Sequence, residues 1–253
     1  MSRQGDASVA NGIVVHTRGE VLDGAKEYVR KQLTTFARRL PARLDAARVK
    51  LTAFTKPSAP VPALAQANLQ IEGRPVRAQV AAPFFTEAAG LLRARLKEQI
   101  AMLTAPRTGR PWDGAAPLGP ATAKVTGRRE IVRHKTYELT ECAPGEATFT
   151  MDLMDYDFYL FTDSETGEDS VVYRVGPTGY KLARLASLAP PAGPAAVPLT
   201  VNVHPVPHQT PAEAAGRLDE TALPFTFFLD STTSRGAVVY RRYDGHYGHL
   251  APR

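Results

Sequence analysis

The chain has 253 residues, of which 43% are hydrophobic and 22% are charged, a composition that excludes a wholly disordered protein. No apolar run approaches the roughly 18–20 residues of a membrane span, and residues 1–10 lack the apolar region of a secretory signal. The single cysteine, Cys142, excludes an internal disulfide and a zinc ribbon. Together these features predict a cytoplasmic protein.

The net charge of +6 is unevenly distributed. Residues 1–105 hold 16 Lys or Arg against 8 Asp or Glu, and residues 106–130 hold 5 against 2. Residues 131–253 reverse the balance, with 10 basic against 15 acidic side chains. A basic front half favours a polyanionic partner, although basic surfaces also serve solubility.

Hydrophobic periodicity predicts the order β-α-β-β-β-α for residues 1–105. Apolar residues recur every three or four positions from Leu22 to Leu40 and from Leu92 to Leu103, which is typical of amphipathic helices. A sheet with both helices on one face would bury both apolar stripes. The predicted elements are strands 12–17, 47–55, 64–71 and 74–81 and helices 19–40 and 85–103, with a hairpin turn at Glu72-Gly73.

Residues 106–130 are rich in proline and glycine, which predicts an extended linker. The only tryptophan, Trp112, lies within it. A locally packed aromatic side chain is the simpler interpretation of Trp112, and an anchor that docks on binding is the alternative.

An internal repeat dominates the back half. Residues 132–183 align without a gap with residues 199–250 at an offset of 67, and about 14 of roughly 52 positions are identical. We expect two small β-rich units, residues 131–187 and 199–253, separated by a proline-rich linker over 188–198. Each has a leading strand (131–139 or 199–206), a short helix (144–154 or 211–218), an aromatic strand (158–162 or 225–229), a Val-Val-Tyr-Arg strand and a last strand.

Units of about 55 residues are marginal for folding alone, so we expect the two repeats to pair within one chain as a pseudo-dimer. The fold class is therefore α+β, with the two repeats following the β-α-β-β-β-α domain. The side chains expected at the pairing interface are Phe158, Phe161, Val172, Tyr173, Phe225, Phe228, Val239 and Tyr240.

Basic side chains of the first domain are the candidate RNA contacts, because RNA helices offer mainly phosphates and sugar hydroxyls. Several lie off the apolar stripe of the first predicted helix, and Arg93 and Lys97 are one turn apart on the second. The alternative for each is an ordinary solvated helix face. The full set is Arg18, Lys26, Arg30, Lys31, Arg38, Arg39, Lys50, Arg74, Arg77, Arg93 and Lys97.

Catalytic and metal-binding patterns are weak. The chain has no phosphate-binding glycine-rich loop and no Gly-x-Ser-x-Gly motif. His204 and His208 have helical ligand spacing, but Pro205 and Pro207 forbid the helix. The acidic cluster Asp152, Asp155 and Asp157 lacks the glutamate and glycine of a calcium loop, so we expect solvated or helix-capping carboxylates. We therefore expect no enzyme activity, no cofactor, no metal and no small-molecule substrate.

The repeats resemble the C-terminal domain of long-form ribosome hibernation-promoting factors. The residues that carry the resemblance are Val238 to Arg242, Asp244 to Gly248 and Pro252 in the second repeat, and Lys135 to Tyr137, Asp163 to Gly167 and Val171 to Arg174 in the first. The first domain resembles the family's ribosome-binding domain in its element order and in the stretch Leu96 to Gln99. The tandem duplication resembles the mycobacterial hypoxia-associated factors.

The resemblance implies a non-enzymatic ribosome hibernation factor. It implies binding to the small subunit, to ribosomal RNA and proteins near the decoding region, where the factor blocks mRNA and tRNA under stress. A regulator acting on rRNA or tRNA off the ribosome and a factor that dimerises ribosomes are the alternatives. Because a short tether favours pairing within the chain, we expect a free monomer that holds single ribosomes.

Overall fold

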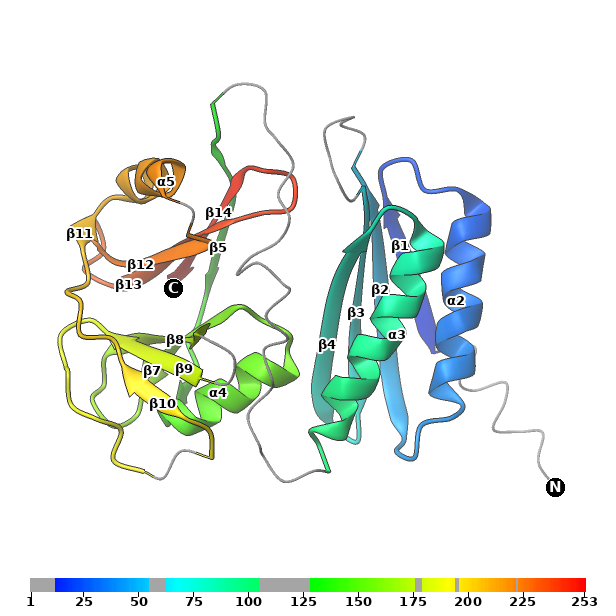
Figure 1. The fold of residues 1–253 in the computed structure, drawn as a ribbon, viewed down its shortest axis with the longest axis horizontal. Helices are drawn as coiled ribbons and strands as arrows, with labels where there is room; N and C mark the ends of the chain where they lie inside the picture. Colours follow the sequence, from blue (N-terminus) through cyan, green and yellow to red (C-terminus); the bar gives the residue numbers. More distant parts are fainter. Residues whose placement is uncertain (1–11, 55–61, 105–127, 176–178, 194–195, 222) are drawn as a thin grey trace. The chain divides into compact units, whose positions relative to one another are not determined.

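The computed structural model describes residues 12–54, 62–104, 128–175, 179–193, 196–221 and 223–253 (Figure 1). The chain divides into two compact units. The predicted linker at 106–130 and its Trp112 lie outside the described residues, apart from 128–130. The first unit comprises Met1–Pro106 and Leu153–Asp155, and the second comprises Arg107–Asp152 and Tyr156–Arg253.

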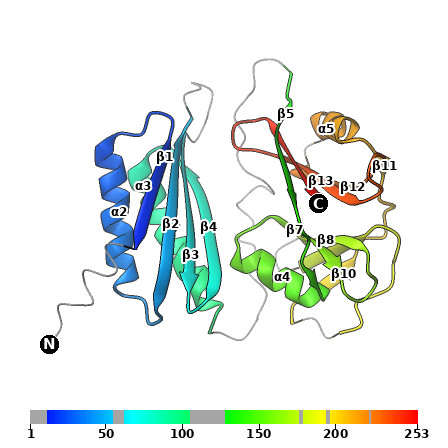
Figure 2. The same cartoon turned by 180° about the vertical axis from the view of Figure 1, so that it is seen from behind.

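The first unit is a four-stranded sheet in the order β1-β2-β3-β4, with helices α2 and α3 on one face (Figures 1 and 2). Strands β1 and β2 are parallel, whereas β2, β3 and β4 are antiparallel neighbours. The predicted β-α-β-β-β-α order is confirmed. The elements are β1 (Ile13–Arg18), α2 (Asp23–Ala37), β2 (Leu44–Ala53), β3 (Ala63–Ile71), β4 (Arg74–Ala82) and α3 (Phe85–Ala101).

Alternation along the strands places the apolar side chains of this sheet beneath the helices. Val49 and Leu51 of β2 are fully buried there, as are Leu92 and Leu96 of α3. The β3–β4 hairpin turns at Glu72 and Gly73, whose φ angles are 48° and 77°. Both residues lie in the left-handed region that a two-residue hairpin requires, as the sequence predicted.

The second unit contains two five-stranded sheets, one for each repeat. The structure repeats at the same offset of 67 residues as the sequence, because each helix and central strand of one repeat has its equivalent in the other. The first repeat contributes β5 (Ile131–Tyr137), β6 (Glu141–Cys142), α4 (Pro144–Leu153), β7 (Phe158–Asp163), β8 (Asp169–Val175) and β9 (Gly179–Arg184). The second contributes β10 (Leu199–Val201), β11 (His208–Gln209), α5 (Pro211–Glu220), β12 (Phe225–Asp230), β13 (Gly236–Arg241) and β14 (Tyr247–Pro252).

The repeats exchange their leading strands. The first sheet has the order β10-β9-β8-β7-β6 and the second has β11-β12-β13-β14-β5, so β5 and β10 each pair in the other repeat's sheet. Both exchanged strands run parallel to the last strand of that sheet. Strand β10 stops at Val201, which corrects the predicted strand 199–206. Pro205 and Pro207 cannot donate to a ladder, and the His204 amide donates to Asn202 Oδ1 instead.

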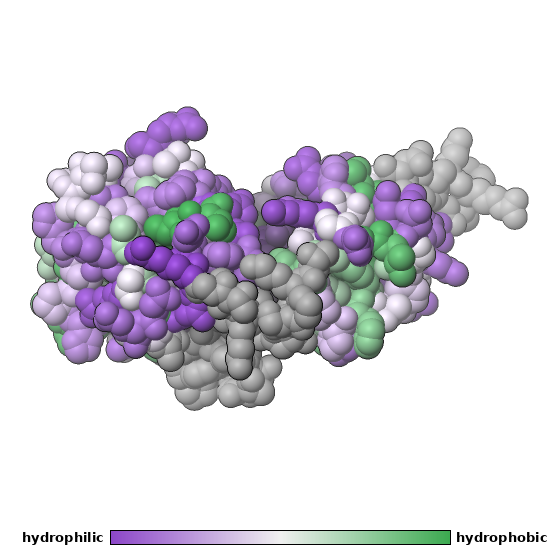
Figure 3. All heavy atoms as spheres, turned by 90° about the horizontal axis from the view of Figure 1, so that it is seen from above, coloured by the Kyte–Doolittle hydropathy of each residue, from purple (hydrophilic) through white to green (hydrophobic). Residues whose placement is uncertain are grey.

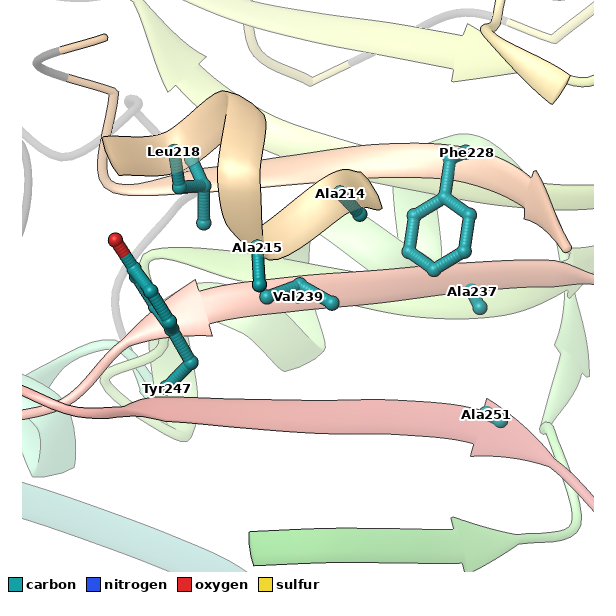
Figure 4. Packing of buried hydrophobic residues seen from close by; sticks show 8 residues of the cluster. All are labelled: Ala214, Ala215, Leu218, Phe228, Ala237, Val239, Tyr247 and Ala251. Carbon is teal, nitrogen blue, oxygen red and sulfur yellow. The ribbon is translucent and has the colours of Figure 1, made fainter. Parts of the chain in front are cut away.

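Three apolar clusters hold the second unit together. One lies between α4 and the first sheet and includes Met151, and one lies between α5 and the second sheet and includes Leu218. Figure 4 shows this last cluster, with Phe228 and Tyr247 on the sheet below the helix. The third contains Leu160 and Val171 from one sheet with Phe227 and Val238 from the other, so it joins the two repeats.

Candidate functional site

The first unit carries its basic side chains on two layers. Strand alternation leaves one side of the sheet, opposite α2 and α3, without a helix, and we call it the open face. Arg18, Lys50 and Arg77 lie on the open face. The helix layer holds the predicted RNA contacts of α2, α3 and the turn after α2, which are Lys26, Arg30, Lys31, Arg38, Arg39, Arg93 and Lys97. Arg74 begins β4 at the hairpin end of the sheet.

The strands themselves place polar and basic side chains on the open face, and the segment Leu153–Asp155 of the same unit lies against it at β4. Arg77 donates there to the carbonyl oxygens of Met154 and Asp155, at 3.0 and 3.2 Å, and the Gln79 amide donates to the Asp155 carboxylate at 3.0 Å. Register places His16, Lys50, Gln66 and Gln79 in one row across the four strands. The next row holds Arg48, Asn68 and Arg77 beside Val14. The sequence prediction missed Arg48. The signal that could have identified it is its alternation with Lys50 on an exposed strand face.

Carboxylates interrupt the helix layer. Arg30 pairs with Glu27 at 2.8 Å along α2. Arg93 donates to Gln32 Oε1 at 2.6 Å and so joins α3 to α2. Lys31, Arg39 and Lys97 are exposed. The face seen in Figure 3 is mostly hydrophilic among the described residues, with apolar side chains in small groups. Two opposed layers of cations on a domain of this size suit phosphates approaching from both sides.

The interface between the repeats contains half of the predicted pairing residues. Phe158 and Phe225, which are equivalent positions, have ring centroids 4.6 Å apart. The Phe158–Tyr240 and Tyr173–Phe225 ring pairs lie at 5.9 Å and 5.4 Å and are each other's counterparts under the repeat offset. Reciprocal contacts of this kind define a pseudo-twofold interface.

The other four predicted interface residues face the opposite way. Phe161 and Val172 lie in the cluster beneath α4, and Phe228 and Val239 lie in the cluster beneath α5. The reason is the two-residue period of a strand, which sends neighbouring side chains to opposite faces. The interface instead includes Leu160, Val171, Phe227 and Val238.

The acidic cluster proves to be structural at its first two members. The Asp155 side chain is 7% exposed and accepts from Arg95 and from the Gln79 amide, both at 3.0 Å. Asp152 is nearly buried, and its carboxylate accepts from Arg174 at 2.6 Å and from the Tyr180 hydroxyl at 2.6 Å. This corrects the expectation of a solvated or capping side chain. Burial raises the pKa of the Cys142 thiol to about 11, and Glu146 adds to the effect, so the thiol is protonated at neutral pH.

Two further findings concern ligands and membranes. Among the described residues, no group of three or more His, Cys, Asp or Glu side chains could hold a metal ion. No helix formed by these residues is both long and apolar enough to cross a bilayer.

Comparison with known proteins gives matches to both repeats and to most of the chain. Residues 126–182 and 200–248 match the family described as "Sigma 54 modulation/S30EA ribosomal protein C terminus". The chain is 43% identical over 217 residues to the dormancy associated translation inhibitor of Mycobacterium tuberculosis, covering 81% of this chain and 76% of that protein.

Two further proteins match a smaller part of the chain. The ribosome hibernation promotion factor of Mycobacterium tuberculosis is 36% identical over 94 residues, covering 36% of this chain and 42% of that protein. A solved ribosomal subunit interface protein from Coxiella burnetii covers 36% of the chain and 94% of its own length, at 17% identity and a TM-score of 0.30.

Proposed function

The chain belongs to the ribosome hibernation factor family that includes the mycobacterial dormancy associated translation inhibitor, and from this membership we propose that it inhibits translation by binding the small ribosomal subunit. The observation that carries the proposal is the pair of opposed basic layers on the β-α-β-β-β-α domain. The predicted contacts on both layers belong to one compact unit. A domain that is basic on two sides fits a cleft between RNA walls, as expected near the decoding region.

The inhibition follows from occupancy. A domain lodged in the path of mRNA and tRNA competes with both without any chemical step. Its affinity comes from Lys and Arg that displace counterions from phosphates, so binding weakens steeply as salt rises. The open face adds amides, Gln66, Asn68 and Gln79, which can both donate and accept hydrogen bonds with ribose hydroxyls or base edges.

The paired repeats support a factor that acts as a monomer. The apolar cluster around Leu160 and Phe227 is formed by two sheets of the same chain. The exchanged strands β5 and β10 tie each repeat to the other sheet. A tether between the repeats gives an effective concentration on the order of millimolar, far above that of a second chain. The factor therefore stabilises single ribosomes.

Sucrose-gradient sedimentation of ribosomes with added factor tests this function. One variant reverses the helix layer (Lys26→Glu, Lys31→Glu, Arg39→Glu), and another reverses the open face (Arg18→Glu, Arg48→Glu, Lys50→Glu). Each triple should weaken small-subunit binding at least about tenfold, and the six changes together should abolish it. The matched control reverses three exposed side chains of the second unit, Arg133, Arg217 and Arg253, and should bind normally.

The gradients separate the alternatives. Unchanged binding by the variant with all six changes would show that the RNA-binding surface is placed wrongly. If only one of the two triple variants weakened binding, the proposal that RNA contacts both sides of the domain would be wrong. A disome peak that grows with added factor would indicate a ribosome-dimerising protein. Tight binding to free rRNA or tRNA without co-sedimentation would indicate a regulator acting off the ribosome.

A further inference from the structure

Two histidines meet where the exchanged strand β5 joins the second sheet, and we call this junction the β5 seam. His134 of β5 lies in register with His249 of β14. The Nδ1 atoms are 3.3 Å apart, and the rings meet edge to face with centroids 5.4 Å apart. His249 is only 8% exposed, and its Nε2 atom is buried with no hydrogen-bond partner among the described residues.

The equivalent junction in the other repeat, the β10 seam, has no titratable pair. The repeat offset places Val201 at the position of His134 and Leu182 at the position of His249, and those two residues are again in register. Leu182 is fully buried in the cluster beneath α4. The molecule therefore holds one exchanged strand with an apolar pair and the other with an imidazole pair.

Few charges surround the histidines. From β12, Asp230 is the carboxylate that acts on His249, and Phe228 stacks on its ring at 6.2 Å. Arg133 and Lys135 flank His134 along β5 and point to the other face of the strand. Helix α5 covers this side of the sheet, and its charged residues are Glu213, Arg217, Asp219 and Glu220.

Divergence of the repeats leaves Asp230 available to act on the pair. In the first repeat the equivalent carboxylate, Asp163, is neutralised by Arg184 at 2.6 Å. The position of Arg184 is occupied by Ala251 in the second repeat. Asp230 keeps the hydrogen bond from the Thr232 amide at 2.9 Å, which is the equivalent of the Glu165 amide bond to Asp163.

We propose that the His134–His249 pair is a proton-sensitive latch that holds strand β5 on the second sheet near neutral pH and releases it on acidification. When both rings are neutral, the N–H of one can donate to the bare nitrogen of the other. One added proton is tolerated, because a ring nitrogen still accepts and Asp230 offsets the charge. A second proton leaves two N–H groups facing each other at 3.3 Å, which separates the strands.

The direction of the pH effect follows from the buried ring. Burial lowers the pKa of His249 below its ordinary value of 6.5, and the neighbouring His134 lowers it further. His249 of β14 therefore binds a proton more readily when β5 is released than when it is docked. The seam has its full stability above the ordinary histidine pKa and loses it as the pH falls through that value toward the lowered one.

Strand β5 is suited to respond because it is an edge strand. Among the described residues its only sheet neighbour is β14, and its central residues are exposed. The ladder is closed at its ends by bonds from the Tyr247 amide to the Glu130 carbonyl, at 2.9 Å, and from the Arg253 amide to the Tyr137 carbonyl, at 3.0 Å. Losing the pairs in between frees one continuous segment.

Hydrogen exchange of the full-length protein tests the latch. After correction for the intrinsic rate, protection of β5 amides should fall about tenfold or more between pH 7.5 and pH 5.5, because protonation at the seam favours the released strand. Amides of β9, which carry the β10 seam, should keep their protection. The variant His134→Val/His249→Leu copies the apolar pair, and it should hold β5 equally at both pH values.

Two results would overturn the proposal: equal β5 protection at both pH values in the natural protein, or the same loss in the apolar variant. An NMR titration of the natural protein keeps the test independent of how the variant folds. The His249 imidazole should titrate below its ordinary value of 6.5, because burial and the neighbouring His134 both lower its pKa. A His249 titration at the ordinary value would equally refute the latch.

Discussion

The two repeats share a fold but stabilise equivalent positions with different chemistry. In the first repeat, the fully buried Arg184 bridges Asp163 and Glu165. In the second, Ala251 occupies the arginine position, while Asp230 keeps the backbone hydrogen bond, from the Thr232 amide, that Asp163 also accepts from the Glu165 amide. Other contacts are retained, since the Tyr180 hydroxyl donates to Asp152 and the Tyr247 hydroxyl to Asp219.

This contrast separates the features that both repeats share, and that the fold therefore requires, from the polar pairs that are found in one repeat alone. The strands and the helix recur in both repeats at a constant offset, so the apolar pattern carries the architecture. The Arg184 ion pairs occur in the first repeat only and the His134–His249 pair lies on the second sheet only, so the shared architecture does not depend on either. Each repeat can therefore serve as the internal control for the other.

The largest effect should come from making the first repeat resemble the second at its ion pair. Arg184→Ala leaves Asp163 buried and uncompensated, so the free energy of unfolding should fall by about 3–5 kcal/mol. Urea denaturation of the full chain, followed by far-UV circular dichroism, measures the loss. The double variant Arg184→Met/Asp163→Asn buries no charge there and should recover most of it. Equal losses in the single and double variants would contradict this account.

A smaller effect is expected at the pseudo-twofold interface. Phe158→Ala and Phe225→Ala should each lower the free energy of unfolding by about 2–4 kcal/mol, because each removes half of one ring pair. Their double variant should lose about 0.5–1.5 kcal/mol less than the sum, since the rings contact each other. Strictly additive losses would show that the two rings do not stabilise one another.

The smallest effect should come from Gly236, the counterpart of Asp169. An added Cβ would lie 2.7 Å from Asp169 Cβ and 2.9 Å from the Phe227 ring. Gly236→Ala should therefore cost about 1–3 kcal/mol in thermal or urea unfolding. At Gly216 in α5 an added Cβ would have no described atom within 4 Å outside the helix's own neighbouring backbone. Gly216→Ala should therefore raise the free energy of unfolding by up to about 1 kcal/mol. A neutral Gly236→Ala would mean that the sheets separate there at little cost.

Much of the fold was readable from the sequence because local periodicity determines it. The stripes through Val29 and Leu92 placed both helices of the first unit, and Glu72-Gly73 placed its hairpin. The exchange of β5 and β10 could not be read in the same way. Pairing of a strand with a distant partner is set by tertiary contacts, and β10 has only three residues.

The residue types that form the candidate sites could be predicted from the sequence, but the directions in which their side chains face could not. The aromatic strands predicted an interface between the repeats. Which face of each strand meets the other repeat depends on the tertiary packing, which turns Phe158 toward the interface and Phe161 toward the cluster beneath α4. In the first unit, the basic residues were evident from composition. Their division between the helix layer and the open face required the register of four strands. Arg48 was missed although Lys50, on the same exposed face of β2, was in the predicted set, and the two-residue period of the strand would have included both.

The exchange of leading strands also dictates an order of folding. Strand β5 is the first element of the second unit to be synthesised, and its partner β14 is the last, more than a hundred residues later. Such non-local closure is slow, because the entropy of the intervening chain is lost before the contacts form. The sheet and helices of residues 12–104 close only short connections, so they can form while the repeats are still emerging, and their contacts with Leu153–Asp155 follow once the first repeat is made. The closing step of the whole protein is then the docking of its β5 seam.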